Sequence, residues 1–210
     1  MPEPVFTRVH LPRPVFSDTV TNLLTRLMGS DVPRPVVFEV HASSDGINHV
    51  MGCAPTAVQR LKRLLRDHLP GVAFEAATRA DVAAVSRVVA HPAVLPLAET
   101  DPEQVTAAIY QALAARRGQE HVAIQLILGR AHGARPLSPK AADPFQQVVG
   151  VMLDGVRPAA GETRKRMEHR SSTPTLSVTL RIGVTADSHK RTVALIWEVW
   201  LLADSCGLAR

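Results

Sequence analysis

The sequence predicts an α+β fold in which helices pack on a mainly antiparallel sheet. The chain has 210 residues, of which 46% are hydrophobic and 20% charged, so it can bury a sizeable core and does not belong to the disordered class. Short β-branched runs alternate with turn signals and single amphipathic helices. Because hairpins interrupt the alternation of strand and helix, we expect an antiparallel sheet rather than a doubly wound parallel one.

The first 35 residues are predicted to be an irregular arm with one short helix. Prolines at this density prevent long helices, since each lacks a backbone donor and restricts the residue before it. Residues 17–28 are the exception, because Ser17 or Asp18 can cap a helix and apolar residues follow at helical spacing. The prolines of the arm are Pro2, Pro4, Pro12, Pro14, Pro33 and Pro35.

Residues 36–132 are predicted to form the first α+β unit. Two β-branched runs, 36–42 and 47–53, are joined by Ser-Ser-Asp-Gly, which is a strong hairpin signal. Pro55 opens an amphipathic helix that the next Pro-Gly pair ends, and residues 72–78 follow as a strand.

The same unit continues with a second cycle of strand, helix and strand. Residues 81–90 favour a strand, although helical spacing competes there. Asp101 and Pro102 open a helix that runs to Arg117, with Asp101 as its cap. Residues 122–128 are an apolar run suited to a central strand.

Residues 133–161 are predicted to be a connector, and residues 162–210 to close the fold with a helix, a strand and a helix that complete the sheet. The connector contains several Pro and Gly residues and one short helix around residues 145–153. Residues 162–170 are polar and favour a helix. Residues 175–185 alternate apolar and polar side chains, as a half-buried strand does.

The last helix is predicted to begin after a cap at Asp187 or Ser188. Its apolar stripe comprises Val193, Ile196, Trp197, Trp200 and Leu201. Two interpretations of Trp197 and Trp200 stay open: packing against the sheet, or an anchor for a partner or a neighbouring subunit, since Trp is enriched at interface hot spots.

The order of elements predicts a ferredoxin-like α/β sandwich. A duplicated version of that unit is an open alternative. It follows from element order alone, because the two halves share no repeated motif.

No motif of the common catalytic classes occurs in the sequence. A phosphate-binding loop, a nucleophile elbow, a zincin motif and a dinucleotide fingerprint are all missing. We therefore predict that the chain is not an enzyme and has no cofactor. A small enzyme remains an alternative if His121, His132 or His189 meets a carboxylate in a deep pocket. His49 and Cys53 are four apart on one strand, about 13 Å, which is too far to share a metal ion.

A basic cluster is the main charged feature of the chain, whose net charge is +5. Such a cluster can contact DNA phosphate or an acidic partner, but no aromatic residues lie within it to stack on bases. We expect at most weak, non-specific DNA contact there. The cluster consists of Arg164, Lys165, Arg166, His169 and Arg170.

The sequence predicts a cytoplasmic protein. No run of about 18 apolar residues and no signal peptide is present. Cys53 and Cys206 belong to no paired-cysteine motif, so both are expected to be reduced thiols.

Several phrases resemble the N-terminal region of actinobacterial type IV secretory system conjugative DNA transfer proteins. They are PVVFEVHA, the GCAP before the first long helix, AETDPEQV, the strand VAIQLILGR and the closing TLRIGVTADSHKRT. The resemblance covers about residues 30–205. In that family this region precedes a RecA-like motor that drives DNA or protein through a conjugation channel.

The resemblance implies an accessory domain, either a truncated product or a fragment, that docks the motor on the secretion apparatus or helps it oligomerise. None of the ATPase residues of the family has a counterpart in this chain. The predicted function is therefore a non-catalytic interaction domain whose partners are secretion-apparatus proteins or its own subunits. The alternatives are a small basic nucleic-acid-binding domain and, behind it, a small ferredoxin-like enzyme.

Overall fold

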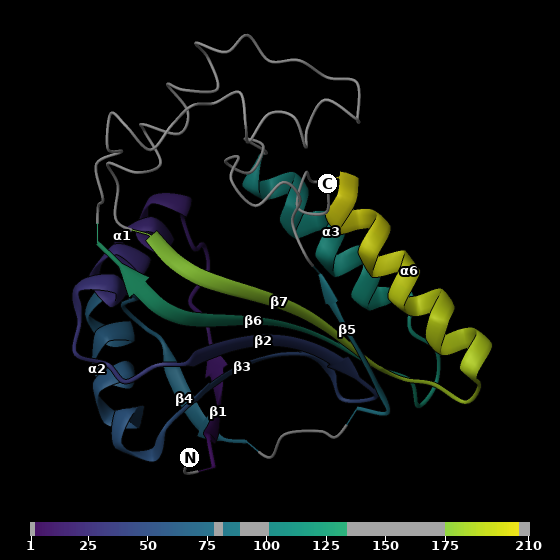
Figure 1. Ribbon diagram of the computed structural model, residues 1–210, viewed down its shortest axis with the longest axis horizontal. Helices are drawn as coiled ribbons and strands as arrows, with labels where there is room; N and C mark the ends of the chain where they lie inside the picture. Colours follow the sequence, from purple (N-terminus) through teal and green to yellow (C-terminus); the bar gives the residue numbers. More distant parts are fainter. Residues whose placement is uncertain (1–2, 78–81, 89–100, 134–174, 206–210) are drawn as a thin grey trace, which may run out of the picture.

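A computed structural model of the chain describes residues 3–77, 82–88, 101–133 and 175–205. These residues form one seven-stranded sheet in the order β4-β1-β3-β2-β6-β7-β5, and every strand pairing is antiparallel. Figure 1 shows the helices in two pairs, α1 beside α2 and α3 beside α6. The predicted α+β class and mainly antiparallel sheet are confirmed.

The elements of the described residues have the following bounds. The strands are β1 (Val5–His10), β2 (Val36–Ser43), β3 (Gly46–Cys53), β4 (Ala73–Ala76), β5 (Ala84–Val88), β6 (His121–His132) and β7 (Thr175–Thr185). The helices are α1 (Ser17–Gly29), the 3-10 turn η1 (Pro55–Ala57), α2 (Val58–His68), α3 (Pro102–Ala114) and α6 (His189–Ser205).

Two of the predicted caps, Asp101 and Ser188, agree with the structure, and the cap predicted at Ser17 or Asp18 is wrong, because α1 begins at Ser17 after Phe16 and no side chain caps it. The Asp101 side chain accepts a hydrogen bond from the backbone N–H of Glu103 at 3.0 Å. Ser188 accepts one from the backbone N–H of Arg191 at 3.2 Å, so Ser188 is the side-chain cap of α6. Each cap satisfies a donor that the first turn of a helix leaves without a partner.

The N-terminal arm is not irregular throughout, and that prediction was wrong. Residues Val5–His10 form β1, which lies inside the sheet between β3 and β4. Thr7 and Val9 are buried while their neighbours are more exposed, so the run alternates as a strand should. The prolines of the arm flank this run rather than interrupt it, because Pro4 precedes it and Pro12 follows it.

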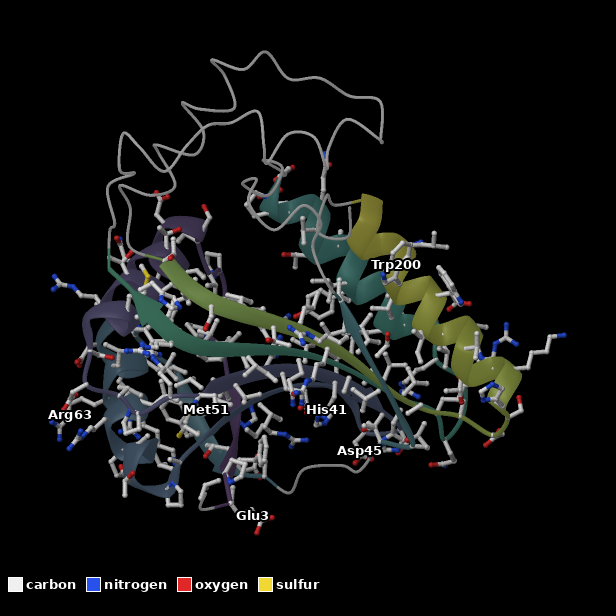
Figure 2. All side chains as sticks on the ribbon, viewed as in Figure 1. Glu3, His41, Asp45, Met51, Arg63 and Trp200 are labelled. Carbon is white, nitrogen blue, oxygen red and sulfur yellow. The ribbon has the colours of Figure 1, made fainter. Side chains whose placement is uncertain are left out.

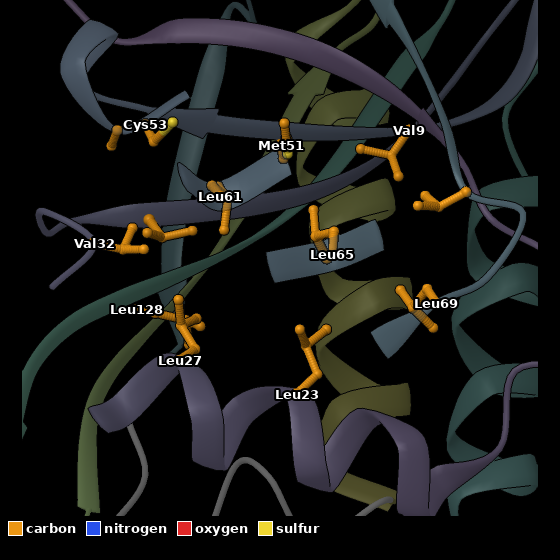
Figure 3. Packing of buried hydrophobic residues seen from close by; sticks show 13 residues of the cluster. Val9, Leu23, Leu27, Val32, Met51, Cys53, Leu61, Leu65, Leu69 and Leu128 are labelled. Atoms are coloured by element: carbon orange, nitrogen blue, oxygen red, sulfur yellow. The ribbon is translucent and has the colours of Figure 1, made fainter. Parts of the chain in front are cut away.

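Two separate cores lie on the same face of the sheet. The first joins α1 and α2 to the sheet through residues such as Leu27, Leu61 and Leu65 (Figure 3). The second joins α3 and α6 to the sheet and includes Leu113 and Leu195. The strand register places both cores on one face, because strand positions an even number apart share a face. Val36 pairs with Leu128 in the first core, and Ala42 pairs with Val122 in the second.

Some predictions fall on residues that the structure does not describe. These are the connector from residue 134 onward with its short helix at 145–153, the helix at 162–170, and Cys206. The division of the chain at residues 35, 132 and 161 stays a prediction.

Candidate functional site

The exposed side of α6 is the first candidate site. Val193, Trp197 and Leu201 are exposed by 38%, 52% and 57%, and they follow each other at four-residue spacing. Four-residue spacing aligns side chains along one side of a helix. They therefore form an apolar stripe, the α6 stripe, that no described residue covers.

The two tryptophans of the predicted apolar stripe differ in their exposure to solvent. Trp200 (Figure 2) packs against the core of α3 and α6, whereas Trp197 is half exposed to solvent. Their rings meet edge to face, with centroids 5.3 Å apart. Trp200 is thus partly buried and contacts the ring of Trp197, and Trp197 is the more exposed of the two.

A partly buried ion pair connects the N-terminal end of α6 to the turn after α3. Arg191 Nε donates to Glu120 Oε1 at 2.8 Å, and Arg191 Nη2 donates to Glu120 Oε2 at 3.1 Å and to the carbonyl of Ala115 at 2.8 Å. The backbone N–H of Arg117 also donates to Glu120 at 2.7 Å. The hydrogen bond from Arg191 holds the pKa of the Glu120 carboxyl below its usual range. Glu120 therefore ties α6 to the turn after α3, which explains this acidic residue without a catalytic role.

The predicted basic cluster at residues 164–170 lies outside the described residues. The described basic side chains do not form one continuous face. Arg87 and Arg181 lie directly opposite each other on β5 and β7, on the sheet face that no described helix covers. Arg60 and Arg63 are exposed on α2, on the other face (Figure 2 labels Arg63), and Arg60 pairs with Asp31 at 2.8 Å.

A groove on the helix-covered face is the second candidate site. The two helix pairs leave the middle of the sheet uncovered by any described residue, and the groove there has a volume of about 620 Å³. Its floor consists of side chains that are only half buried although they lie on central strands. They are Phe38, Val40, Ile124, Leu126 and Leu180.

The walls of the groove come from α1 and α3. Leu11 and Val15, which precede α1, form one wall together with Leu24. Val105 and Ala108 on α3 line the other. The size of the groove falls within the range of about 300–1,000 Å³ that is typical of small-molecule sites.

One polar pair lies beside this apolar groove. His49 on β3 lines the groove, and the hydroxyl of Tyr110 on α3 is 3.0 Å from its Nε2. Burial lowers the pKa of His49, and the charges of Arg13 and His41 lower it further. Both effects favour the neutral form of the imidazole.

The histidines that an enzyme function would need, His121, His132 and His189, are not all close to one another. His121 and His132 lie at opposite ends of the 12-residue strand β6, which is about 36 Å long at the usual rise per residue. Within the described residues, no group of three or more His, Cys, Asp or Glu side chains could hold a metal ion. Cys53 is 2% exposed and packs within the first hydrophobic core.

The sequence did not predict the groove or its polar pair. His49 and Tyr110 are 61 residues apart, and their contact depends on how α3 crosses the sheet. A weak signal existed, since Tyr110 is the only tyrosine of the chain and follows the apolar Ile109 on a predicted helix.

The comparisons with known proteins do not identify the chain. A scan against models of protein families and a search of curated proteins both give no match. None of the described helices has the length and apolar character needed to span a bilayer.

Proposed function

We propose that the chain is a non-catalytic accessory domain of a conjugative DNA transfer ATPase, acting in the cytoplasm as an oligomerisation module. The phrases that resemble the N-terminal region of those ATPases support the assignment to conjugation. The α6 stripe is the observation that carries the oligomerisation role. An exposed Trp flanked by apolar residues at helical spacing is the kind of anchor that interfaces use.

We propose that the occupant of the α6 stripe is a second copy of this chain. Val193 and Leu201 lie four residues to either side of Trp197, so an antiparallel pair of α6 helices would place Trp197 against its copy and Val193 against Leu201.

The topology supports a duplicated ferredoxin-like architecture for this domain. The order β1-α1-β2-β3-α2-β4 with the sheet order β4-β1-β3-β2 is that of a ferredoxin-like unit. Within the described residues, the order β5-α3-β6-β7-α6 with the sheet order β6-β7-β5 repeats all of that unit except its last strand. The two units would then join edge to edge through β2 and β6, and α6 would occupy the position that α2 has in the first unit.

Light scattering coupled to size exclusion tests the proposal. The wild-type chain is expected to elute as a dimer, and Trp197→Ser is expected to give a monomer. The matched control is Phe16→Ser, because Phe16 is also exposed, by 65%, but lies just before α1, away from the stripe. A monomeric wild type, or a dimer that survives Trp197→Ser, would reject self-association through α6.

Nucleic-acid contact is a second candidate function, favoured by the pair Arg87 and Arg181. Like charges directly opposite on neighbouring strands are unfavourable unless an anion neutralises them. Adding a short DNA duplex to the same experiment at low and moderate salt tests this function. A complex that dissociates as salt rises, and that a double Arg87→Gln and Arg181→Gln variant fails to form, would support it.

A further inference from the structure

The groove between α1 and α3 has the features of a binding site for a lipid-like small molecule. Its floor is formed by apolar side chains of β2, β6 and β7, and its walls by apolar side chains of the two helices. Glu39 also lines it, but Glu39 lies at an odd position of β2, so its side chain is on the opposite face, where it accepts a hydrogen bond from Gln125 at 2.9 Å. Among the described residues that line the groove, His49 is therefore the ionisable side chain on the helix-covered face of the sheet.

The apolar surface selects the kind of ligand. A peptide in an extended conformation would bring backbone N–H and C=O groups that these walls cannot satisfy. An acyl chain brings no polar group along its length, so an apolar groove can accommodate it. The half-buried Phe38, Ile124 and Leu180 on the floor would lose their remaining contact with water when such a chain binds.

The polar groups nearby select the head group. Tyr110 and His49 form a hydrogen-bonded pair beside the groove, and the phenol can donate to an acidic head. Arg13 lies between Leu11 and Val15, both of which line the groove, and its charge is near enough to act on His49. A positive charge and a hydroxyl donor next to an apolar groove complement a carboxylate.

We infer that the groove binds a fatty acid, with its acyl chain along the floor between α1 and α3 and its carboxylate near Arg13 and the His49–Tyr110 pair. The inference is independent of the proposed oligomerisation, because the α6 stripe contributes no residue to the groove.

A pair of alanine substitutions on α3 tests the location of the site. Ala108 lines the groove, whereas the neighbouring Ala107 is exposed and does not. Both positions are helical, so Ala108→Trp and Ala107→Trp carry the same change in helix propensity. Binding of a fluorescent C18 polyene fatty acid, and its displacement by oleate, is measured for each variant.

We expect saturable binding of one fatty acid per wild-type chain. Ala108→Trp should weaken it by about tenfold or more, because the indole occupies the groove, and Ala107→Trp should leave it unchanged. The head group is tested by Arg13→Gln, which should weaken oleate and leave oleyl alcohol unaffected. Circular dichroism confirms that each variant is folded.

Three results would overturn the inference. The first is a wild-type chain that shows no saturable uptake, as expected if other residues of the chain already fill the groove. The second is an equal effect of the two tryptophan variants. The third is binding to phosphatidylglycerol vesicles without binding to the monomeric fatty acid, which would indicate a lipid surface instead.

Discussion

At the scale of single residues, the buried carboxylates Glu39 and Glu120 are stabilised by hydrogen-bond donors. Glu120 is 5% exposed and accepts hydrogen bonds from Arg191 and from the backbone of Arg117. Glu39, also 5% exposed, accepts one from Gln125. A buried carboxylate is stable only when such donors replace the water that it lost.

The Glu120–Arg191 pair makes stability depend on pH. The folded state holds the pKa of Glu120 below that of the unfolded chain, so the unfolded state takes up a proton more readily. The stabilisation is complete above the unfolded pKa of about 4.3, and it is lost as the pH falls through the lower, folded pKa. We expect Glu120→Gln to reduce the free energy of unfolding at pH 7 by about 2 kcal/mol and to lose less stability on acidification than the wild type.

Urea unfolding at a series of pH values between neutral and about 3 measures this difference. Glu3→Gln serves as the control, because Glu3 is exposed near the N-terminus (Figure 2). The account fails if the wild type and Glu120→Gln keep a constant difference in stability over the whole series.

Residue-scale features were the least predictable from the sequence. Glu120 and Arg191 are 71 residues apart, and the residues around each of them in the sequence do not distinguish it from a charged residue on the surface. Trp197 and Trp200 belong to one apolar stripe in the sequence. In the structure Trp200 is partly buried against the core of α3 and α6 and Trp197 is 52% exposed, a difference that spacing alone does not predict.

At the scale of elements, local chemistry decides the structure. The hairpin of β2 and β3 follows from Ser-Ser-Asp-Gly, but its geometry differs from that of a turn with two left-handed residues. Within this hairpin, Gly46 is the residue with a positive φ, of 99°, and it pairs with Ser43 at the base of a two-residue loop. The backbone N–H of Asp45 also donates to the Ser43 hydroxyl at 3.2 Å. A glycine is required at position 46, because other residues rarely adopt that φ.

Two Gly→Ala substitutions separate conformation from packing. We expect Gly46→Ala to destabilise the protein by about 1–2 kcal/mol, although its Cβ would meet no atom within 4 Å. Gly29 also has open space for a Cβ, and its φ is not positive. Gly29→Ala should therefore be neutral or stabilising by about 0.4–1 kcal/mol. Chemical denaturation of the two variants side by side checks this, and a similar loss in both would contradict the role of the Gly46 conformation.

Most elements in the described residues could be predicted, because hydrophobic period and cap residues are local signals. The strand β1 could not be predicted in this way. The many prolines near the N-terminus favour an irregular segment, although they lie outside the short alternating run Val5–His10. That run becomes a strand because β3 and β4 offer it pairing on both sides, which is a tertiary effect.

At the scale of the whole molecule, the decisive feature is the arrangement of two helix pairs on one sheet. Each pair buries its own core, and β2 pairs with β6 to make the sheet continuous. The sequence indicates the class of this fold, because hairpins and single helices are visible in it. It does not indicate the groove, which exists because the two helix pairs stay apart.

The arrangement leaves α6 at the outside of the molecule with an apolar stripe exposed, and self-association through this stripe is the central claim of the account. Register-specific disulfide cross-linking tests it most directly. Antiparallel α6 helices that meet at Trp197 bring Val193 of one copy near Leu201 of the other. The two copies of Val193 would lie about 12 Å apart along the axis, beyond the reach of a disulfide.

The measurement mixes two chains, one with Val193→Cys and one with Leu201→Cys, each in a Cys206→Ser background, and oxidises them. Cys53 is buried and stays in both. The account predicts covalent dimers in the mixture and few in either variant alone. No cross-link in the mixture, or equal cross-linking of each variant with itself, would contradict the antiparallel dimer.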